Sequence, residues 1–186
     1  MKKILILSFT LMLLISQAYG FNNKKEGFIL GVGGGYHHTG INQENISNKN
    51  FKGFASSIRA GVGITDKVLS YYIREASWFR VENLTQSKDI YISGISGIGV
   101  SYYIQNNKFN YPIYIIGALG LSDLANVSVI SSIPDTGFGY LVGLGYEIKN
   151  HVSIEAKMMS TDIDVEFTFN DIKTKSFNIT LNYLWY

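Results

Sequence analysis

Apolar and polar residues alternate along most of this chain, and the alternation is most regular over residues 175–186. Every second residue from Phe177 to Trp185 is apolar or aromatic, and most residues between them are polar. Successive side chains of a β-strand point to opposite faces of the sheet. This stretch therefore predicts a strand with one apolar and one polar face.

Alternating runs of about ten residues recur along the earlier sequence, separated by polar connections, which is typical of barrel strands. The predicted strands are 27–37, 51–64, 68–82, 90–105, 112–121, 137–148, 152–158 and 175–186. The connections alternate in length: long over 38–50, short over 65–67, long over 83–89, short over 106–111, long over 122–136, short over 149–151 and long over 160–174. We count one domain, since no linker or shift in composition divides the chain.

This pattern predicts an all-β fold, an eight-stranded antiparallel up-and-down transmembrane β-barrel. Isoleucine and tyrosine dominate one face of the runs, and glycine, serine and charged residues dominate the other. We expect the first face to meet lipid and the second to fill a narrow interior. With both termini at the periplasmic end, the long connections face outward, as the rule for bacterial barrels requires.

The run over 68–82 fits this scheme least well. Placing Leu69, Tyr71 and Ile73 against lipid also places Glu75 there. The opposite register exposes Arg74, and an arginine facing lipid at the bilayer centre costs about 2–4 kcal/mol. We therefore expect the first register, with either a bulge near Glu75 and Ala76 or a strand whose upper part stands above the membrane.

Three sets of residues follow from the predicted faces. A polar network inside the barrel is expected from the inward charges Arg59, Glu147, Glu155 and Lys157, with the two cations neutralising the two carboxylates. Its simplest role is structural, and the alternative is a proton or ion path. An aromatic girdle at the short-turn end is expected from Tyr71, Tyr102, Tyr146, Tyr183 and Trp185. A second girdle at the long-loop end is expected from Tyr36, Phe54, Phe79, Phe138 and Phe177.

Residues 1–20 have the pattern of a cleaved signal peptide. Lys2 and Lys3 precede an apolar run over 4–15, and small residues lead to a cleavage site after Gly20. The apolar run is shorter than the roughly 20 residues of a membrane-spanning helix, which disfavours the alternative of an uncleaved anchor. We expect residues 21–186 to form the barrel domain in the outer membrane of a Gram-negative cell. A net charge of +2 is too small to indicate a nucleic-acid partner.

Three motifs bear on possible chemistry, and we expect no cofactor, no metal site and no enzymatic activity. The glycines of residues 31–35 lack the helix and Gly-Lys-Ser/Thr of a phosphate loop. His37 and His38 are adjacent on a strand and point to opposite faces, so they cannot share a metal. The sequence His151-Val152-Ser153, followed by Glu155, resembles the active site of lipid A deacylases, but it falls in a predicted periplasmic turn.

The alternating strands and the closing run from Phe177 to Trp185 resemble the eight-stranded outer-membrane barrels of the OmpA/OmpX type, including opacity-protein-like adhesins. In that family the closing strand is read by the barrel-assembly machinery, although Tyr186 lies one residue beyond the usual terminal aromatic. The resemblance implies a porin-like monomer surrounded by outer-membrane lipid. It also implies a structural or surface-interaction role through extracellular loops, whose external partner the sequence does not identify. The alternatives are a narrow channel, a lipid-modifying enzyme and a soluble exported barrel of the lipocalin kind.

Overall fold

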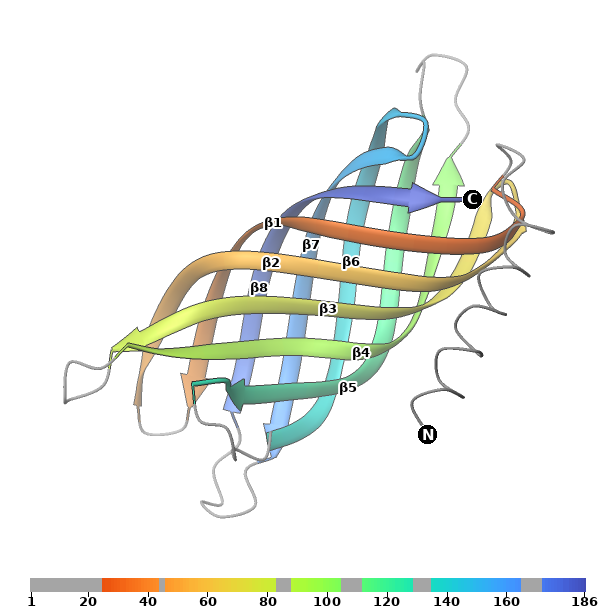
Figure 1. The fold of residues 1–186 in the computed structure, drawn as a ribbon. Helices are drawn as coiled ribbons and strands as arrows, with labels where there is room; N and C mark the ends of the chain where they lie inside the picture. The colour runs from red at the N-terminus through yellow and green to blue at the C-terminus, as the bar shows by residue number, and fades with distance from the viewer. Residues whose placement is uncertain (1–24, 44–45, 83–87, 105–111, 129–134, 165–171) are drawn as a thin grey trace, which may run out of the picture.

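A computed structural model shows one closed barrel of eight antiparallel strands (Figure 1). It describes residues 25–43, 46–82, 88–104, 112–128, 135–164 and 172–186. The strands are β1 (Gly27–Gln43), β2 (Ile46–Thr65), β3 (Val68–Glu82), β4 (Lys88–Ile104), β5 (Ile113–Asn126), β6 (Asp135–Lys149), β7 (Val152–Asp164) and β8 (Ile172–Trp185). The predicted fold class is therefore confirmed.

Each strand pairs with its neighbours in sequence, and β8 pairs back with β1 from Leu30↔Trp185 to Gln43↔Ile172. The start of β1, the end of β8 and the connections β2–β3, β4–β5 and β6–β7 lie at one end, which we call the turn end (Figure 1). The ends of β1, β3, β5 and β7 and the starts of β2, β4, β6 and β8 lie at the opposite end, which we call the loop end. No helix long and apolar enough to cross a membrane occurs among the described residues.

The outer wall is apolar and the interior is lined by small, polar and charged residues, as the alternation predicts. Leu119 and Leu121 on β5 are exposed on the outer wall, whereas Ile116 on the same strand is fully buried inside. Inward glycines make room for inward tyrosines. A Cβ at Gly99 would lie 2.5 Å from Cε2 of Tyr71, and one at Gly145 would lie 2.1 Å from Cζ of Tyr114. These two glycines therefore allow large rings to fit inside a narrow barrel.

The predicted register of β3 is wrong. Leu69, Tyr71, Ile73 and Glu75 are buried inside the barrel, and Arg74 points outward. The β3–β4 ladder runs without a register shift from Val68↔Tyr102 to Glu82↔Lys88, so the expected bulge is absent from it. This orientation of β3 is tolerated because both charges are paired. The Arg74 guanidinium contacts the Asp123 carboxylate on the outer wall, and Glu75 contacts Lys157 inside the barrel.

The predicted long connections are also shorter than expected, because strands continue into them. The predicted 38–50 loop is mostly a paired hairpin, in which β1 and β2 keep their ladder to Gln43↔Ile46. Strands β5 and β6 likewise extend into 122–136, and β7 and β8 into 160–174. Backbone hydrogen bonds form whatever the polarity of the side chains, so the ladder continues where the alternation stops. The predicted leader, residues 1–20, lies outside the described residues.

Candidate functional site

The centre of the barrel is occupied by an ion pair between Arg59 on β2 and Glu155 on β7. Nη1 of Arg59 donates to Oε1 of Glu155 at 2.6 Å, and Nη2 contacts Oε2. Both side chains are almost completely buried. Such a two-point pair fixes the orientation of the guanidinium as well as neutralising it. Two residues that the sequence places inside are thus in direct contact, although their strands are three apart around the barrel.

Lys157 extends this pair into a network that crosses the barrel. Its Nζ lies 3.0 Å from Oε2 of Glu155 and 2.8 Å from Oε2 of Glu75, which projects from β3 on the opposite wall. Nδ2 of Asn178 donates to the other oxygen of Glu75 at 3.1 Å. Two cations and two carboxylates therefore neutralise each other where an unpaired charge would be costly.

Two tyrosines hold the network in place. The hydroxyl of Tyr114 lies 2.7 Å from both Oγ of Ser153 and Oε1 of Glu155. The Tyr114 hydroxyl is the donor to both atoms, and a carboxylate can only accept. The ring of Tyr71 lies 5.3 Å from the guanidinium carbon of Arg59, a cation–π distance.

The sequence prediction missed Glu75, Tyr71 and Tyr114 as members of this network. The prediction that Tyr71 belongs to the outer girdle is wrong, since its side chain is buried and hydrogen-bonded to Ser101. Phe79 of the second predicted girdle is likewise buried inside. A signal was present: glycines recur on the inward face of β4 and β6, and each leaves a volume that a large neighbouring side chain can fill.

Glu147 belongs to a separate cluster at the turn end. Its carboxylate is paired with Lys25 at 3.0 Å, rather than with Arg59 or Lys157 as the sequence predicts. The same ammonium lies 4.6 Å from the ring of Tyr103 and 5.2 Å from that of Tyr186. Tyr186 follows β8, and burial raises its pKa to about 12. This cluster closes the turn end of the interior.

Aromatic and hydroxyl side chains close the loop end. Phe79 stacks on Phe51, with ring centroids 4.9 Å apart, and meets the edge of His37. Nε2 of His37 lies 2.9 Å from the carbonyl oxygen of Trp78 and Nδ1 lies 2.7 Å from Oγ1 of Thr39. In a neutral imidazole the proton is therefore on Nε2, because a carbonyl can only accept. Among the described residues, no group of three His, Asp or Glu side chains is placed to hold a metal.

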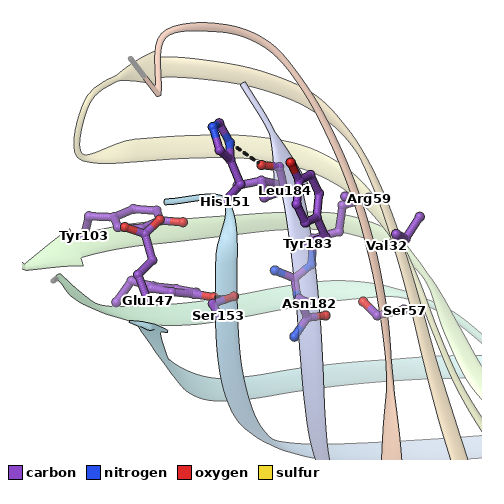
Figure 2. Close-up of a pocket in the computed structure, with 12 residues that line it drawn as sticks. Val32, Ser57, Arg59, Tyr103, Glu147, His151, Ser153, Asn182, Tyr183 and Leu184 are labelled. Carbon is purple, nitrogen blue, oxygen red and sulfur yellow. Dashed lines mark hydrogen bonds between the residues drawn. The ribbon is translucent and has the colours of Figure 1, made fainter. Parts of the chain in front are cut away.

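A small cavity of about 10 Å³ lies between the Arg59–Glu155 network and the turn end (Figure 2). Beside it, Ser57 Oγ and Arg59 Nε are buried and have no hydrogen-bond partner among the residues that the structure describes. That volume is about the space of one water molecule, and a water there would satisfy polar atoms of this kind. The cavity can thus hold a water molecule next to the buried charges.

The residues that resemble a deacylase site are engaged with other groups. Nδ1 of His151 is bonded to the carbonyl oxygen of Leu184 at 2.9 Å (dashed in Figure 2). Ser153 is engaged by Tyr114, and Glu155 is held by Arg59 and Lys157. No contact between His151 and Ser153 is found among the described residues.

The remaining predicted girdle residues lie on the outer wall toward the turn end: Tyr102, Tyr146, Tyr183 and Trp185.

Comparison with known proteins agrees with this geometry. Ail, the attachment invasion locus protein of Yersinia pestis, is similar with a TM-score of 0.59 at 17% identity, over 86% of this chain and 99% of Ail. Neisserial surface protein A is similar with a TM-score of 0.56 at 16% identity, over 84% and 96% of the two chains. OprG of Pseudomonas aeruginosa gives 0.50 at 13% identity, over 88% and 99%. At such identities the likeness shows the fold alone.

Sequence comparison gives the family. A search of curated proteins finds no match. The sequence model of the outer membrane protein beta-barrel domain matches residues 7–184, which is most of the chain. This match, the closed barrel of eight strands and its apolar outer wall are consistent with one another. The chain therefore belongs to the outer membrane protein beta-barrel domain family.

Proposed function

We propose that this protein is a plugged outer-membrane barrel that acts at the cell surface through the hairpins of its loop end. The observation that carries the proposal is the interior: Arg59, Glu155, Lys157 and Glu75 join opposite walls through contacts between buried side chains. An eight-stranded barrel is just wide enough for side chains to fill it. The same contacts support a structural role for the ion-paired network and favour a barrel that does not conduct.

The loop end supplies the surface for an external partner. The β2–β3 ladder stops at Gly53↔Phe79, but β1 stays paired with both β2 and β8 as far as Gln43. A small sheet made of β8, β1 and β2 therefore continues beyond the point where β2 and β3 separate. Paired strands present side chains on a fixed backbone, which suits a recognition surface. The name of Ail, an attachment protein with the same fold, is consistent with this role.

The surface role is tested by trimming the hairpin without touching the barrel. Gly40 and Asn50 are paired across β1 and β2, so residues 41–49 can be replaced by an Asn-Gly turn that joins them. We expect the variant to fold, as judged by heat-modifiable migration and outer-membrane fractionation, and to lose adherence of expressing cells to epithelial layers. Adherence equal to that of wild type would contradict the role of this hairpin.

The second candidate is a narrow ion path. It is favoured by the two unpartnered polar atoms, Ser57 Oγ and Arg59 Nε, beside the water-sized cavity. Single-channel recording in planar bilayers separates the two functions, because a plugged barrel gives no discrete current steps. If wild type does conduct, Arg59→Met should change the unit conductance, and an unchanged conductance would remove Arg59 from the path.

We further propose that the protein has no lipid-hydrolysing activity. The geometry around His151, Ser153 and Glu155 supports this, because His151 is bonded to Leu184, whereas Ser153 and Glu155 are bonded to Tyr114 and Glu155 is also paired with Arg59. The measurement is lipid A hydrolysis by membranes of an overexpressing strain, with Ser153→Ala as the control. Hydrolysis that Ser153→Ala abolishes would contradict the proposal.

A further inference from the structure

Strands β2 and β3 separate at the loop end and leave an open fork in the barrel wall. Their ladder ends at Gly53↔Phe79, whereas β2 continues along β1 to Ile46 and β3 continues along β4 to Glu82. A pocket of about 490 Å³ lies in this fork. It is lined by Lys52, Gly53, Phe54, Trp78, Phe79, Arg80 and Ile90. The two strands are traced separately at the left of Figure 1.

Two cations face each other across the fork. Lys52 precedes Gly53 on β2 and Arg80 follows Phe79 on β3, so the two cations flank the end of the ladder, and both line the pocket. Both are exposed. Neither has an ion pair or hydrogen bond within the part of the chain that the structure describes. Like charges at opposing positions repel, and an anion between them would relieve that repulsion.

The charges that neighbour the fork do not neutralise these cations. His38 lies beside Lys52 on β1, and Arg74 on β3 is already paired with Asp123. Asp89 is the residue of β4 that pairs with Val81, and it is engaged with Asn126. Among the described side chains, the fork therefore carries an excess of positive charge.

An apolar surface lies directly on the barrel side of the two cations. Phe54 and Trp78 are paired across β2 and β3, point outward, and are exposed, and Ile90 lies beside Arg80. Nε1 of Trp78 donates to Oγ of Ser56 at 2.9 Å, which fixes the indole against the wall. Aromatic residues of this kind occur where hydrocarbon gives way to the polar headgroup region. The fork thus combines cations on its outer side with an apolar surface on its membrane side.

We propose that this fork binds an anionic, phosphorylated lipid of the outer leaflet. The phosphate lies between Lys52 and Arg80, and the acyl chains lie along Phe54 and Trp78. A free phosphate ion would use the cations but gain nothing from the exposed aromatic surface, which is why a lipid fits better. The inference rests on the outer-membrane placement of the barrel and on an outward loop end, and it is independent of any adhesive role.

The test uses Trp78 as its own reporter. The chain has two tryptophans, so a Trp185→Phe background leaves Trp78 as the single fluorophore. The barrel is reconstituted in phosphatidylcholine vesicles containing equal fractions of brominated phosphatidic acid or brominated phosphatidylcholine. We expect stronger quenching of Trp78 by the phosphatidic acid. Its preference should fall roughly fivefold in Lys52→Ala or Arg80→Ala and about 25-fold in the double variant.

The controls separate this site from general attraction and from a free-ion site. Lys175→Ala removes a cation from the same end of the barrel on β8 and should leave the preference unchanged, as should the conservative change Lys52→Arg. Excess inorganic phosphate should not displace the brominated lipid. The proposal is overturned by an unchanged preference in the double variant. It is equally overturned by an equal loss in Lys175→Ala or by displacement with inorganic phosphate. Heat-modifiable migration checks that each variant is folded.

Discussion

Two ion pairs of this barrel share the same chemistry and differ in where they lie. Arg59 and Glu155 meet inside the barrel, almost fully buried and tied to Lys157 and Tyr114. Arg74 and Asp123 meet on the outer wall, each with about 26% of its side chain exposed. Both arginines contact both oxygens of their carboxylate. Their surroundings, rather than their geometry, therefore decide how much each pair contributes to stability.

The outer pair shows how an arginine is tolerated on an apolar wall. Arg74 reaches over Gly94 on β4 to a carboxylate two strands away, and Ser96 accepts from the same Nη1 at 3.1 Å. Asp123 lies on the loop-end side of Leu121, which is the residue in register with Ser96. The guanidinium is thus carried toward the loop end of the wall. Long basic side chains commonly place their charge at the interface in this way.

The largest effect is expected inside the barrel. Arg59→Met leaves the lumen with one carboxylate in excess, and removing one partner of a buried pair costs about 3–5 kcal/mol. The free energy of unfolding, measured by urea titration in lipid vesicles, should fall by that amount. Arg59→Met combined with Glu155→Gln removes both charges and should recover most of the loss. A single variant as stable as wild type would show that the network does not support the fold.

A smaller effect is expected from adding a methyl group to the inner face. Gly99→Ala pushes Cβ against the ring of Tyr71, and overpacking of this kind costs about 1–3 kcal/mol. Gly117→Ala is the matched control on the outer wall, where an added Cβ meets nothing within 4 Å. The same urea titration should show Gly117→Ala within experimental error of wild type. Equal losses for the two variants would mean that backbone freedom, not space for Tyr71, explains the inner glycine.

The smallest effect is expected from the outer pair. Asp123→Asn leaves Arg74 partly exposed and bonded to Ser96, so the free energy of unfolding should fall by about 0–1 kcal/mol. Raising the salt concentration should reduce this difference further, since exposed charges are screened. The buried pair should respond much less to salt. A loss comparable to that of Arg59→Met would mean that the two pairs contribute equally to stability, which would contradict the role given to their surroundings.

The alternation of apolar and polar residues is enough to give the fold class and most of the inner and outer faces. Alternation with a period of two fixes which residues of a strand share a face, so the pattern alone is enough to place Arg59, Glu155 and Lys157 inside. Where one face is clearly apolar and the other polar, as in the run containing Phe177, the choice of lipid face follows at once. Eight such runs, with short connections between some of them, are enough to predict a barrel.

The orientation of β3, the partners of the charges and the length of the hairpins depend on contacts between strands that are distant in sequence. Both faces of β3 carry a charge, so the orientation depends on what Arg74 and Glu75 meet on other strands. Lys157 finds Glu75 four strands away, and Glu147 finds Lys25 near the first strand. These contacts depend on how the sheet closes on itself, which no local pattern encodes. The hairpins are longer than predicted because backbone pairing continues where side-chain alternation has ended.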